Sequence, residues 1–343
     1  MAGRTYSVAV VGATGLVGRE FLRIIEQDDF PLKSLRLLAS KRSAGSTLRF
    51  RGEELPVEET TEQSFAGQDF AFVSATTEAS RQWVPIAAQA GAVAIDDSSA
   101  FRMDPSVPLV VPEVNAGDLA GHGRIVAIPN CSTTPLVLAL WPLHRVNPVR
   151  RIVVSTYQSV SGTGTAAVQE LREQARAVAL AGEGGAQPEA SVYPYQIAFN
   201  LLPHIDGFLE NGYTKEEWKM VQETRKIMHA PDLPISATCV RVPVYTCHSE
   251  AVNVELAEPM APEEARELMA AQPGLEIADD PARTLYPHPL MAAGKDPVYV
   301  GRIRRDVSHP RALSMWIVSD NLRKGAALNA LQIARSMVGQ SLL

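Results

Sequence analysis

The chain has 343 residues, of which 46% are hydrophobic, and its formal net charge at pH 7 is −6. This length exceeds the size at which a single hydrophobic core usually stops growing, so we expect two domains with a cleft between them. The charged residues form neither a basic cluster nor an acidic tail, which excludes the electrostatic signature of a protein that binds nucleic acid or a membrane surface. The composition therefore favours a small-molecule partner.

The apolar runs of the sequence are short. The run Leu136–Trp141, for example, is far below the length that spans a bilayer, so no membrane segment is expected. The chain leads from Met1 almost directly into an apolar strand pattern without the features of a secretory leader, and we expect the protein to remain in the cytoplasm. An odd set of three cysteines, Cys131, Cys239 and Cys247, fits a reducing compartment and leaves at least one thiol for chemistry.

Residues 1–130 have the pattern of a doubly wound α/β domain. Short apolar runs alternate with helical patterns or loops, as in a parallel sheet that is covered on both faces. The predicted strands are Ser7–Val11, Leu35–Leu38, Phe70–Ser74, Val93–Asp96 and Ile125–Ile128. We therefore expect a Rossmann-type doubly wound parallel sheet in this region.

Residues 131–320 differ in texture and predict an α+β domain with a mostly antiparallel sheet that leaves one face to solvent. The predicted strands are Ile152–Thr156, Thr238–Val244, Ala251–Leu256, Val298–Arg304 and Ala312–Ser319. Between the first two lie a helical stretch, the loop Glu183–Gln187 and the aromatic segment Tyr193–Phe208, which we interpret as an insertion at a subunit interface. Residues 321–343 contain a helical pattern, Gly325–Val338, that is expected to pack back on the first domain.

A glycine-rich loop, Gly12-Ala13-Thr14-Gly15-Leu16-Val17-Gly18, directly follows the first predicted strand and opens a helix near Leu16. Glycine lets backbone amides approach a pyrophosphate closely, and the positive end of the helix dipole faces that dianion. A strand before such a loop and a helix and second strand after it are the context in which it binds a dinucleotide. The alternative is a tight strand-to-helix turn that has no ligand.

The end of the second predicted strand indicates which dinucleotide is bound. A domain that grips the ribose of NAD usually has an acidic residue at this point. Here the strand ends in Ala39-Ser40-Lys41-Arg42-Ser43. Hydroxyl groups and cations can hold the 2′-phosphate of NADP, where a carboxylate would repel it, so the segment favours NADP over NAD. A solvated basic loop is the alternative interpretation.

The segment Pro129-Asn130-Cys131-Ser132-Thr133-Thr134-Pro135 lies between a predicted buried strand and the helical run Leu136–Leu143. A hydroxyl side chain is available as the N-cap, and Pro135 suits the first helical position. The helix dipole and the N–H groups at this end stabilise a thiolate over a thiol, which favours Cys131 as a nucleophile. Cys239 and Cys247 lie within strand patterns and are expected to pack in the core.

The sequence Asn130-Cys131-Ser132-Thr133-Thr134, together with the loop Gly12–Gly18, resembles the aspartate-β-semialdehyde dehydrogenase family, and the match extends over nearly the whole chain. The resemblance implies that Cys131 is the catalytic nucleophile. It also implies that Gln158, in Tyr157-Gln158-Ser159-Val160-Ser161-Gly162, orients the substrate and that His248 is the acid/base catalyst.

The same resemblance implies the residues that bind substrate and cofactor. It assigns phosphate to Arg102 and Lys219, the substrate ammonium to Glu216 and the substrate carboxylate to Arg241, with Asn130 as a further substrate-binding residue. The implied cofactor-binding residues are Gly12, Thr14, Gly15, Leu16, Val17, Ser40, Arg42, Ser43, Thr76, Ser161, Gly162 and Asn321. The segment Asp320–Gly325 is expected beside the nicotinamide, and no metal site is expected.

Residue chemistry supports the assignment of Glu216 and Lys219. Thr214 and Glu217 have the spacing of a capping box, which predicts a helix that begins after Thr214 and leaves Glu216 for another role. Glu216 and Lys219 stand three positions apart on that helix and can project side by side. An ordinary surface ion pair is the alternative.

Residue chemistry also supports Arg241 and His248. Arg241 offers a planar fork that matches a carboxylate, and histidine changes its protonation near neutral pH. The two residues are an odd number of positions apart, so an unbroken strand would point them to opposite faces. A turn or bulge must therefore intervene, for which Pro243 is a candidate cause. A packing histidine is the alternative interpretation of His248.

Together these features predict the reversible, NADPH-dependent reduction of β-aspartyl phosphate to aspartate β-semialdehyde through a thioester on Cys131. The reaction would serve the biosynthesis of lysine, threonine, methionine and diaminopimelate, and we expect a homodimer, with a tetramer as the alternative assembly. One alternative function is N-acetyl-γ-glutamyl-phosphate reductase, whose usual Gly-Cys-Tyr-Pro sequence differs from Asn130-Cys131-Ser132. The other is a catalytically silent NADP-binding regulator, which the presence of both nucleophile and base disfavours.

Overall fold

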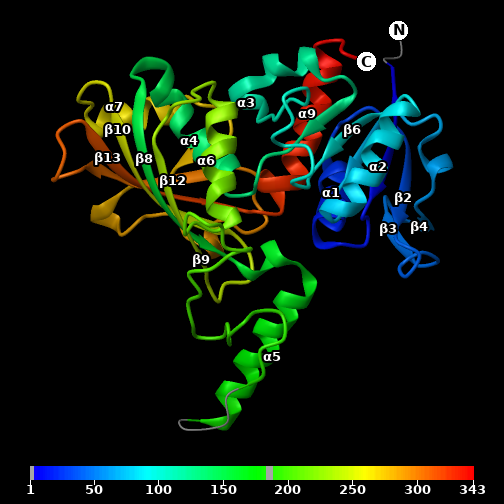
Figure 1. Ribbon diagram of the computed structural model, residues 1–343, viewed down its shortest axis with the longest axis horizontal. Coiled ribbons are helices and arrows are strands. Elements are labelled where there is room, and N and C mark those ends of the chain that lie inside the picture. Colours follow the sequence, from blue (N-terminus) through cyan, green and yellow to red (C-terminus); the bar gives the residue numbers. More distant parts are fainter. Residues whose placement is uncertain (1–3, 183–187) are drawn as a thin grey trace. The chain divides into compact units, whose positions relative to one another are not determined.

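The chain folds into two compact units, each with its own sheet (Figure 1). The computed structural model describes residues 4–182 and 188–343, and the loop predicted at Glu183–Gln187 lies outside them. Unit 1 comprises Met1–Asn130 and Ala326–Leu343, and unit 2 comprises Cys131–Gly325.

In the described chain, unit 1 is built on a seven-stranded sheet with the order β3-β4-β2-β1-β5-β6-β7. All pairings are parallel except that of β3 with β4. The strands are β1 (Tyr6–Val11), β2 (Leu32–Ala39), β3 (Thr47–Phe50), β4 (Glu53–Glu59), β5 (Phe70–Val73), β6 (Val93–Asp96) and β7 (Ile125–Ala127). The predicted doubly wound sheet is confirmed, whereas β3 and β4 were not predicted. Because the strand order changes direction at β1, a crevice is expected outside the carboxyl ends of β1 and its neighbours.

Different helices cover the two faces of this sheet. Val8 and Val10 of β1 pack in the core that includes α1 (Leu16–Gln27) and α9 (Leu328–Gly339). The alternate residues Ala9 and Val11 pack in the core that includes α2 (Thr77–Gln89). Burial on both faces explains why β1 is apolar along its whole length.

The C-terminal helix is part of the core of unit 1. α9 contacts α1, α3 (Pro112–Asn115) and the short helix η2 (Ala116–Gly121). The buried side chain of Asn329 donates a hydrogen bond of 2.8 Å to the carbonyl of Val110. A further short helix, η1 (Glu62–Phe65), precedes β5.

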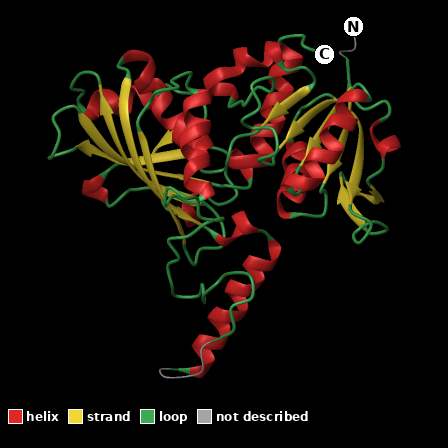
Figure 2. Ribbon diagram, in the orientation of Figure 1, coloured by secondary structure: helices red, strands yellow, loops and turns green. Residues whose placement is uncertain are grey.

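Unit 2 contains, among the described residues, a six-stranded sheet with the order β11-β12-β13-β10-β8-β9 (Figure 2). The strands are β8 (Val149–Gln158), β9 (Ile235–Arg241), β10 (His248–Leu256), β11 (Leu275–Ile277), β12 (Val298–Arg305) and β13 (Ala312–Ser319). β10 is antiparallel to β8 and to β13, and β12 is antiparallel to β13, whereas β8 runs parallel to β9 and β11 to β12. The predicted mostly antiparallel sheet is therefore confirmed.

Helices cover one face of the second sheet. α4 (Thr133–Val146), α6 (Lys215–Ile227) and α7 (Pro262–Ala270) contact its strands. Beyond Glu250, the residues of β10 alternate between buried and half-buried positions, as expected for a strand in a sheet that is covered on one face only. The shorter elements are η3 (Val160–Thr163), η4 (Pro281–Arg283), α8 (Pro289–Ala292) and the π-turn η5 (Arg323–Ala327).

α5 (Thr165–Ala181) extends away from the sheet of unit 2, and the segment that follows it returns beside it (Figure 1). Buried polar side chains of α5 hold this returning segment. The carboxylate of Glu170 accepts the backbone N–H of Ser191 at 3.1 Å, and the amide oxygen of Gln174 accepts the N–H of Ile197 at 2.9 Å. These bonds satisfy backbone groups that no strand or helix pairs.

The connection between β9 and β10 corrects one predicted strand. β9 ends at Arg241 and not at Val244, and residues 242–247 form an irregular connection to His248, the first residue of β10. The expected break between Arg241 and His248 is thus confirmed. Cys247 was predicted within a strand, but it lies in this connection with a left-handed φ of 77°, and the side chain of Asn321 accepts its N–H at 3.0 Å.

The start of α4 also differs from the prediction. The helix begins at Thr133, so Pro135 is its third residue and not its first. A proline is tolerated there because the first amides of a helix have no intrahelical acceptor. Cys131 nevertheless lies directly before the N-terminus of a helix, as predicted.

The predicted capping box at the start of α6 is confirmed. Thr214 Oγ1 accepts the N–H of Glu217 at 3.3 Å, and the carboxylate of Glu217 accepts the N–H of Thr214 at 2.7 Å. The other carboxylate oxygen of Glu217 accepts the N–H of Cys239 on β9 at 3.0 Å. One glutamate therefore caps α6 and attaches it to the sheet.

Thr214→Ala should lower the free energy of unfolding by about 1 kcal/mol, because the N–H of Glu217 loses its capping oxygen. Chemical denaturation followed by circular dichroism would measure the change. Thr214→Ser keeps the oxygen and serves as the control, with stability close to that of the unmodified protein. Identical stability of the alanine and serine variants would contradict a role for the cap.

Candidate active site

A cavity of about 630 Å³ lies at the carboxyl ends of β1, β2 and β5 in unit 1. The residues that line it are Val11, Gly12, Thr14, Gly15, Ala39, Ser40, Lys41, Arg42, Ser43, Glu59, Thr60, Ser74, Ala75, Thr76, Ala79 and Trp83. Most of the predicted cofactor-binding residues of this unit are among them. The position outside the strand ends at a change of strand order is where doubly wound sheets bind nucleotides.

The glycines of the loop Gly12–Gly18 allow close contacts between backbone atoms that any side chain would block. Gly12 has a φ of 82°, and a Cβ on it would lie only 1.9 Å from the carbonyl oxygen of Ser74. A Cβ on Gly18 would lie 2.3 Å from the carbonyl oxygen of Gly12. Gly15 lines the cavity and is the N-cap of α1, so the first amides of α1 begin beside it. Loop and helix terminus together fit a pyrophosphate.

The lining of this cavity differs in part from the predicted cofactor site. Leu16 and Val17 are not among the residues that line it. Glu59 does line it, because β4 pairs with β2 in a register that places Glu59 beside Ala39. Glu59 was not predicted as a cofactor-binding residue because β4 was not predicted. Thr76 lines the cavity and caps α2 by accepting the N–H of Ala79 at 3.3 Å.

Arg102 and Asn130, the predicted substrate-binding residues of unit 1, are both buried. Arg102 Nη2 donates a hydrogen bond of 2.9 Å to the carbonyl of Asp97. Burial raises the pKa of the Asp97 carboxyl to about 7, although the guanidinium of Arg102 acts in the opposite direction. Ser74, which lines the cavity, donates to the Asp97 carboxylate at 3.1 Å. Asp97 therefore connects Arg102 with the cavity wall.

Cys131 is the first residue of unit 2 and lies two positions before the first residue of α4. It is partly exposed, and all three cysteines are thiols. A Cβ on Gly325 would lie 2.9 Å from Cys131 Cβ. The backbone at Gly325 therefore packs directly against the predicted nucleophile.

Arg241, Gln158 and His248 lie on the covered face of the sheet, in neighbouring strands. β8 pairs with β9 so that Gln158 is opposite Arg241, and with β10 so that Thr156 is opposite Glu250. His248, two positions before Glu250, lies on the same face because side chains alternate along a strand. Three predicted site residues thus come together at the end of β8.

Hydrogen bonds connect this row of Arg241, Gln158 and His248 to α6 and to the loop after β8. Gln158 Nε2 donates to the carboxylate of Glu216 at 3.3 Å. Arg241 Nη1 donates to the carbonyl of Ser159 at 2.6 Å, and its guanidinium lies 6.0 Å from the ring centre of Tyr193. Arg241 Nε is buried and has no partner in the described chain, so it can still donate. Ser159 and Tyr193 were not predicted, since they contact Arg241 from distant parts of the sequence.

His248 is completely buried, and its neighbours favour the neutral imidazole. Burial lowers its pKa to about 3, the guanidinium of Arg241 acts in the same direction, and the carboxylate of Glu216 opposes them. Ser161 and Asn321, predicted as cofactor-binding residues, belong to a hydrogen-bond network that reaches His248 through Ser159. Gly162 lies against the same side chain, since a Cβ on it would be 3.1 Å from His248 Nε2.

Glu216 and Lys219 form an ion pair that is more than a surface contact. The ammonium of Lys219 donates to the buried carboxylate of Glu216 at 3.2 Å and to the carboxylate of Asp206 at 2.9 Å. Burial alone would lower the pKa of Lys219, but the two carboxylates raise it. Asp206 was missed by the sequence analysis, although Asp206-Gly207 has the composition of a turn.

Glu250 is a buried acid that the sequence analysis did not identify. Neither of its carboxyl oxygens has a hydrogen-bond partner in the described chain, and burial raises its pKa well above the usual value. Burial without a partner disfavours the charged form of this carboxyl. The side chains of Cys239 and Cys247 are also fully buried. Burial raises the pKa of both thiols, which agrees with the packing role predicted for them.

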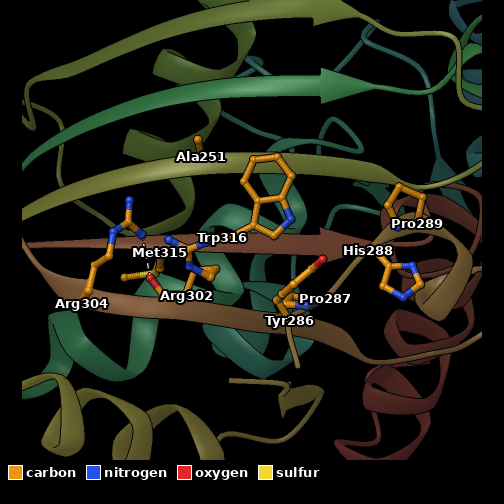
Figure 3. A pocket seen from close by; sticks show the side chains of 9 residues that line it. All are labelled: Ala251, Tyr286, Pro287, His288, Pro289, Arg302, Arg304, Met315 and Trp316. Atoms are coloured by element: carbon orange, nitrogen blue, oxygen red, sulfur yellow. Dashed lines mark hydrogen bonds between the residues drawn. The ribbon is translucent and has the colours of Figure 1, made fainter. Parts of the chain in front are cut away.

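A second cavity, of about 340 Å³, lies on the opposite face of the same sheet (Figure 3). Its walls include Trp316, Arg302 and Arg304, which Figure 3 shows together with Tyr286 from a neighbouring loop. Ala251, which also lines it, is three positions from His248 in the same strand and therefore faces the other way. No predicted site residue lines this cavity.

Within residues 4–182 and 188–343, no group of three or more His, Cys, Asp or Glu side chains is arranged to hold a metal ion. None of the helices in these ranges combines the length and the hydrophobicity that a bilayer crossing requires.

Two protein-family models match the chain. The model of the semialdehyde dehydrogenase NAD binding domain matches residues 7–122. The model of the semialdehyde dehydrogenase dimerisation domain matches residues 140–324. The two matches fall on unit 1 and unit 2, respectively.

Relatives match the chain from end to end. Aspartate-semialdehyde dehydrogenase of Aquifex aeolicus is 51% identical over 98% of this chain and 99% of the relative. The enzyme of the same name from Bacillus subtilis is 48% identical over 98% of both chains. The crystal structure of aspartate semialdehyde dehydrogenase II from Vibrio cholerae complexed with ASA has a TM-score of 0.94 and 44% identity, and covers 98% of this chain and 99% of that chain.

Gly325→Ala should slow the alkylation of Cys131 by iodoacetamide severalfold. The added methyl group would push the thiol away from the helix terminus, whose stabilising effect on a thiolate is short-ranged. Mass spectrometry of the Cys131 peptide would measure the rate. Gly339→Ala is the matched control, because a Cβ there meets nothing within 4 Å. Unchanged alkylation in Gly325→Ala would show that the close contact does not position the thiol.

Proposed function

Because the chain belongs to the aspartate-semialdehyde dehydrogenase family, we propose that it reduces β-aspartyl phosphate to aspartate β-semialdehyde and phosphate, reversibly and with NADPH. The observation that supports this most strongly is the row of Arg241, Gln158 and His248 joined to Glu216. In this arrangement Arg241 can bind a carboxylate, Gln158 can orient an acyl group and Glu216 can bind an ammonium.

The cavity of unit 1 fits NADP. The loop at Gly12 and the start of α1 suit the pyrophosphate, and Ser40, Arg42 and Ser43 suit the 2′-phosphate through hydroxyl and guanidinium donors. When bound, NADPH supplies the hydride, and the protein contributes binding and orientation. Residues 1–130 with the C-terminal helix are thus proposed as the NADP-binding domain and residues 131–320 as the catalytic and dimerisation domain. Ser161, Gly162 and Asn321 are proposed to meet the nicotinamide end.

Cys131 is the proposed nucleophile. Its place before α4 favours the thiolate, which attacks the acyl carbon of β-aspartyl phosphate and expels phosphate. The thioester then accepts hydride to give a thiohemiacetal, at whose oxygen His248 is the proposed acid/base catalyst. The thiohemiacetal releases the aldehyde and the Cys131 thiolate. Splitting the reduction into two steps gives each of them a good leaving group.

The substrate is proposed to bind through three charged groups of unit 2. Arg241 receives the carboxylate with its planar donors, and Glu216 receives the ammonium. Lys219 is held as a cation by Glu216 and Asp206 and is proposed to bind phosphate. Arg102 and Asn130 of unit 1 are proposed to bind the substrate as well, and Gln158 to orient the acyl group.

N-Acetyl-γ-glutamyl phosphate is the substrate of the competing function. Its nitrogen is acylated and uncharged, so this substrate would offer Glu216 no ammonium in addition to that of Lys219. Assays with both acyl phosphates separate the two functions. Turnover of the N-acetyl compound alone would contradict the proposal.

We propose that the chain forms a homodimer through unit 2, with a tetramer as the alternative. The match to a dimerisation domain supports this. Large apolar side chains are also exposed on α5 and on the segment after it, namely Leu180, Tyr195, Phe199, Leu201 and Phe208. Single exposed apolar residues are common on monomers, but gathered ones suit an interface. The product is proposed to feed the synthesis of lysine, threonine, methionine and diaminopimelate.

Cys131→Ala should abolish turnover and leave the affinity for NADP nearly unchanged, because the thiol acts in chemistry and the cofactor cavity lies in unit 1. Steady-state assays and fluorescence titration with NADPH would measure the two effects. Cys239→Ala, which removes a thiol outside the proposed chemistry, is the control and should retain turnover. Phosphate-dependent oxidation of the semialdehyde by Cys131→Ala would contradict the covalent mechanism.

Arg42→Ala should reduce the preference for NADP over NAD by about ten- to a hundredfold, which corresponds to the loss of one charge-assisted hydrogen bond. The ratio of kcat/KM for the two cofactors measures the preference. Arg49→Ala is the control, since Arg49 is an exposed cation on β3 that does not line the cavity. An unmodified enzyme that uses both cofactors equally well would contradict the assignment.

A further inference from the structure

The connection that leads into α6 contacts two of the proposed substrate-binding residues. Leu202 pairs with Arg241 through two backbone hydrogen bonds of 2.8 and 3.0 Å. Further along the connection, the carboxylate of Asp206 meets Lys219, whose Nζ donates to Asp206 Oδ2 at 2.9 Å. Asp206 Oδ1 accepts the N–H of Gly207 at 2.7 Å. Both oxygens of this carboxylate are therefore hydrogen-bonded, which holds it beside the ammonium of Lys219.

Lys219 is shared between two carboxylates. Its Nζ also donates to Glu216 Oε2, at 3.2 Å, which is a longer bond than the one to Asp206. An ammonium has three N–H groups, of which these bonds use two. The other oxygen of Glu216, Oε1, accepts a hydrogen bond of 3.3 Å from Gln158 Nε2. Glu216 therefore lies between Lys219 and Gln158.

The formal charges of Asp206, Lys219 and Glu216 do not cancel. Glu216 and Lys219 alone would form a neutral pair, which attracts a substrate ammonium only weakly. With Asp206, the two carboxylates and one ammonium carry one net negative charge. Arg241 carries the positive charge that matches the substrate carboxylate. The four side chains together thus complement a substrate end that has one ammonium and one carboxylate.

Partial burial lets these charges act on one another. The side chain of Glu216 is 7% exposed, that of Lys219 25% and that of Asp206 39%. Charges that are withdrawn from solvent are screened less than charges on the surface. Burial acts to raise the pKa of Asp206, but the hydrogen bonds from Lys219 and Gly207 hold this pKa below its usual value, so the carboxylate is charged at neutral pH. Lys215 also acts on Asp206, but it is exposed and therefore more strongly screened.

We propose that Asp206 is a positioning residue for recognition of the substrate amine: it holds Lys219 and supplies the negative charge that leaves Glu216 able to bind the substrate ammonium. This inference rests on the proposed function, in which Glu216 binds the ammonium and Lys219 the phosphate. Loss of the Asp206 charge should therefore impair a substrate that has an ammonium more than the same substrate without one.

Asp206→Asn removes the charge and keeps both the shape of the side chain and a hydrogen-bond acceptor. Asparagine also tolerates the left-handed φ of 66° at this position. Phosphate-dependent oxidation is measured with aspartate semialdehyde and with succinic semialdehyde, which is the same aldehyde without the amino group. We expect the ratio of the two kcat/KM values to fall by about tenfold, through a higher KM for aspartate semialdehyde, because a nearby opposite charge is lost.

Glu210→Gln is the matched control, since it removes one negative charge from an exposed residue of the same connection and should leave the ratio unchanged. Asp206→Gly is a second test variant, because glycine adopts a left-handed φ without strain, and it should lower the ratio as well. An equal loss with both aldehydes, together with a raised KM for phosphate, would mean that Asp206 acts on Lys219 alone and would overturn the proposal. An unchanged ratio would overturn it too.

Binding without turnover gives an independent measurement. Calorimetric titration of the full-length enzyme with aspartate and with succinate, which lacks the ammonium, compares the two affinities directly. We expect the unmodified enzyme to bind aspartate more tightly, and this preference to fall by about tenfold in Asp206→Asn. Equal affinities of the unmodified enzyme for the two compounds would overturn the proposal. An enzyme that prefers aspartate in binding but does not reduce β-aspartyl phosphate would refute the proposed function alone.

Discussion

The pairing of β8 with β9 on one side and with β10 on the other sets the positions of the groups in unit 2. This register places Gln158 between Arg241 and His248 on the covered face of the sheet. A shift by one residue would turn each side chain to the other face. α6 is attached to the same sheet by Glu217, which accepts the N–H of Cys239, and this brings Glu216 to Gln158. Backbone pairing, more than any single side chain, therefore assembles the proposed substrate site.

Buried titratable groups near this face of the sheet differ in the charge that their surroundings favour, and the difference comes from their partners. Lys219 is kept charged by two carboxylates. His248 lies beside a guanidinium and Glu250 has no partner, so burial disfavours the charged form of each. A buried charge survives only where an opposite charge or a hydrogen bond compensates its desolvation. The proposed chemistry needs fixed charges of this kind to hold the charged ends of the substrate.

Local patterns in the sequence predicted the parts of the structure that depend on neighbours along the chain. The loop Gly12–Gly18, the capping box at Thr214 and the helix after Cys131 are of this kind. Contacts between distant segments were not predictable from spacing alone. Asp206 reaches Lys219 from a turn before α6, and Ser159 reaches His248 from the loop after β8. Glu59 enters the cofactor cavity through a strand pair with no strong periodicity. The exact start of α4 was missed because proline is tolerated at any of the first helical positions.

The formation of a thioester on Cys131 is the step from which the proposed roles of the other residues follow. Rapid mixing of the enzyme with β-aspartyl phosphate in the absence of NADPH, followed by acid quenching and mass spectrometry of the Cys131 peptide, observes it directly. We expect one phosphate released per chain and an aspartyl adduct on Cys131. Phosphate release without an adduct, or an adduct on a different residue, would contradict the covalent mechanism.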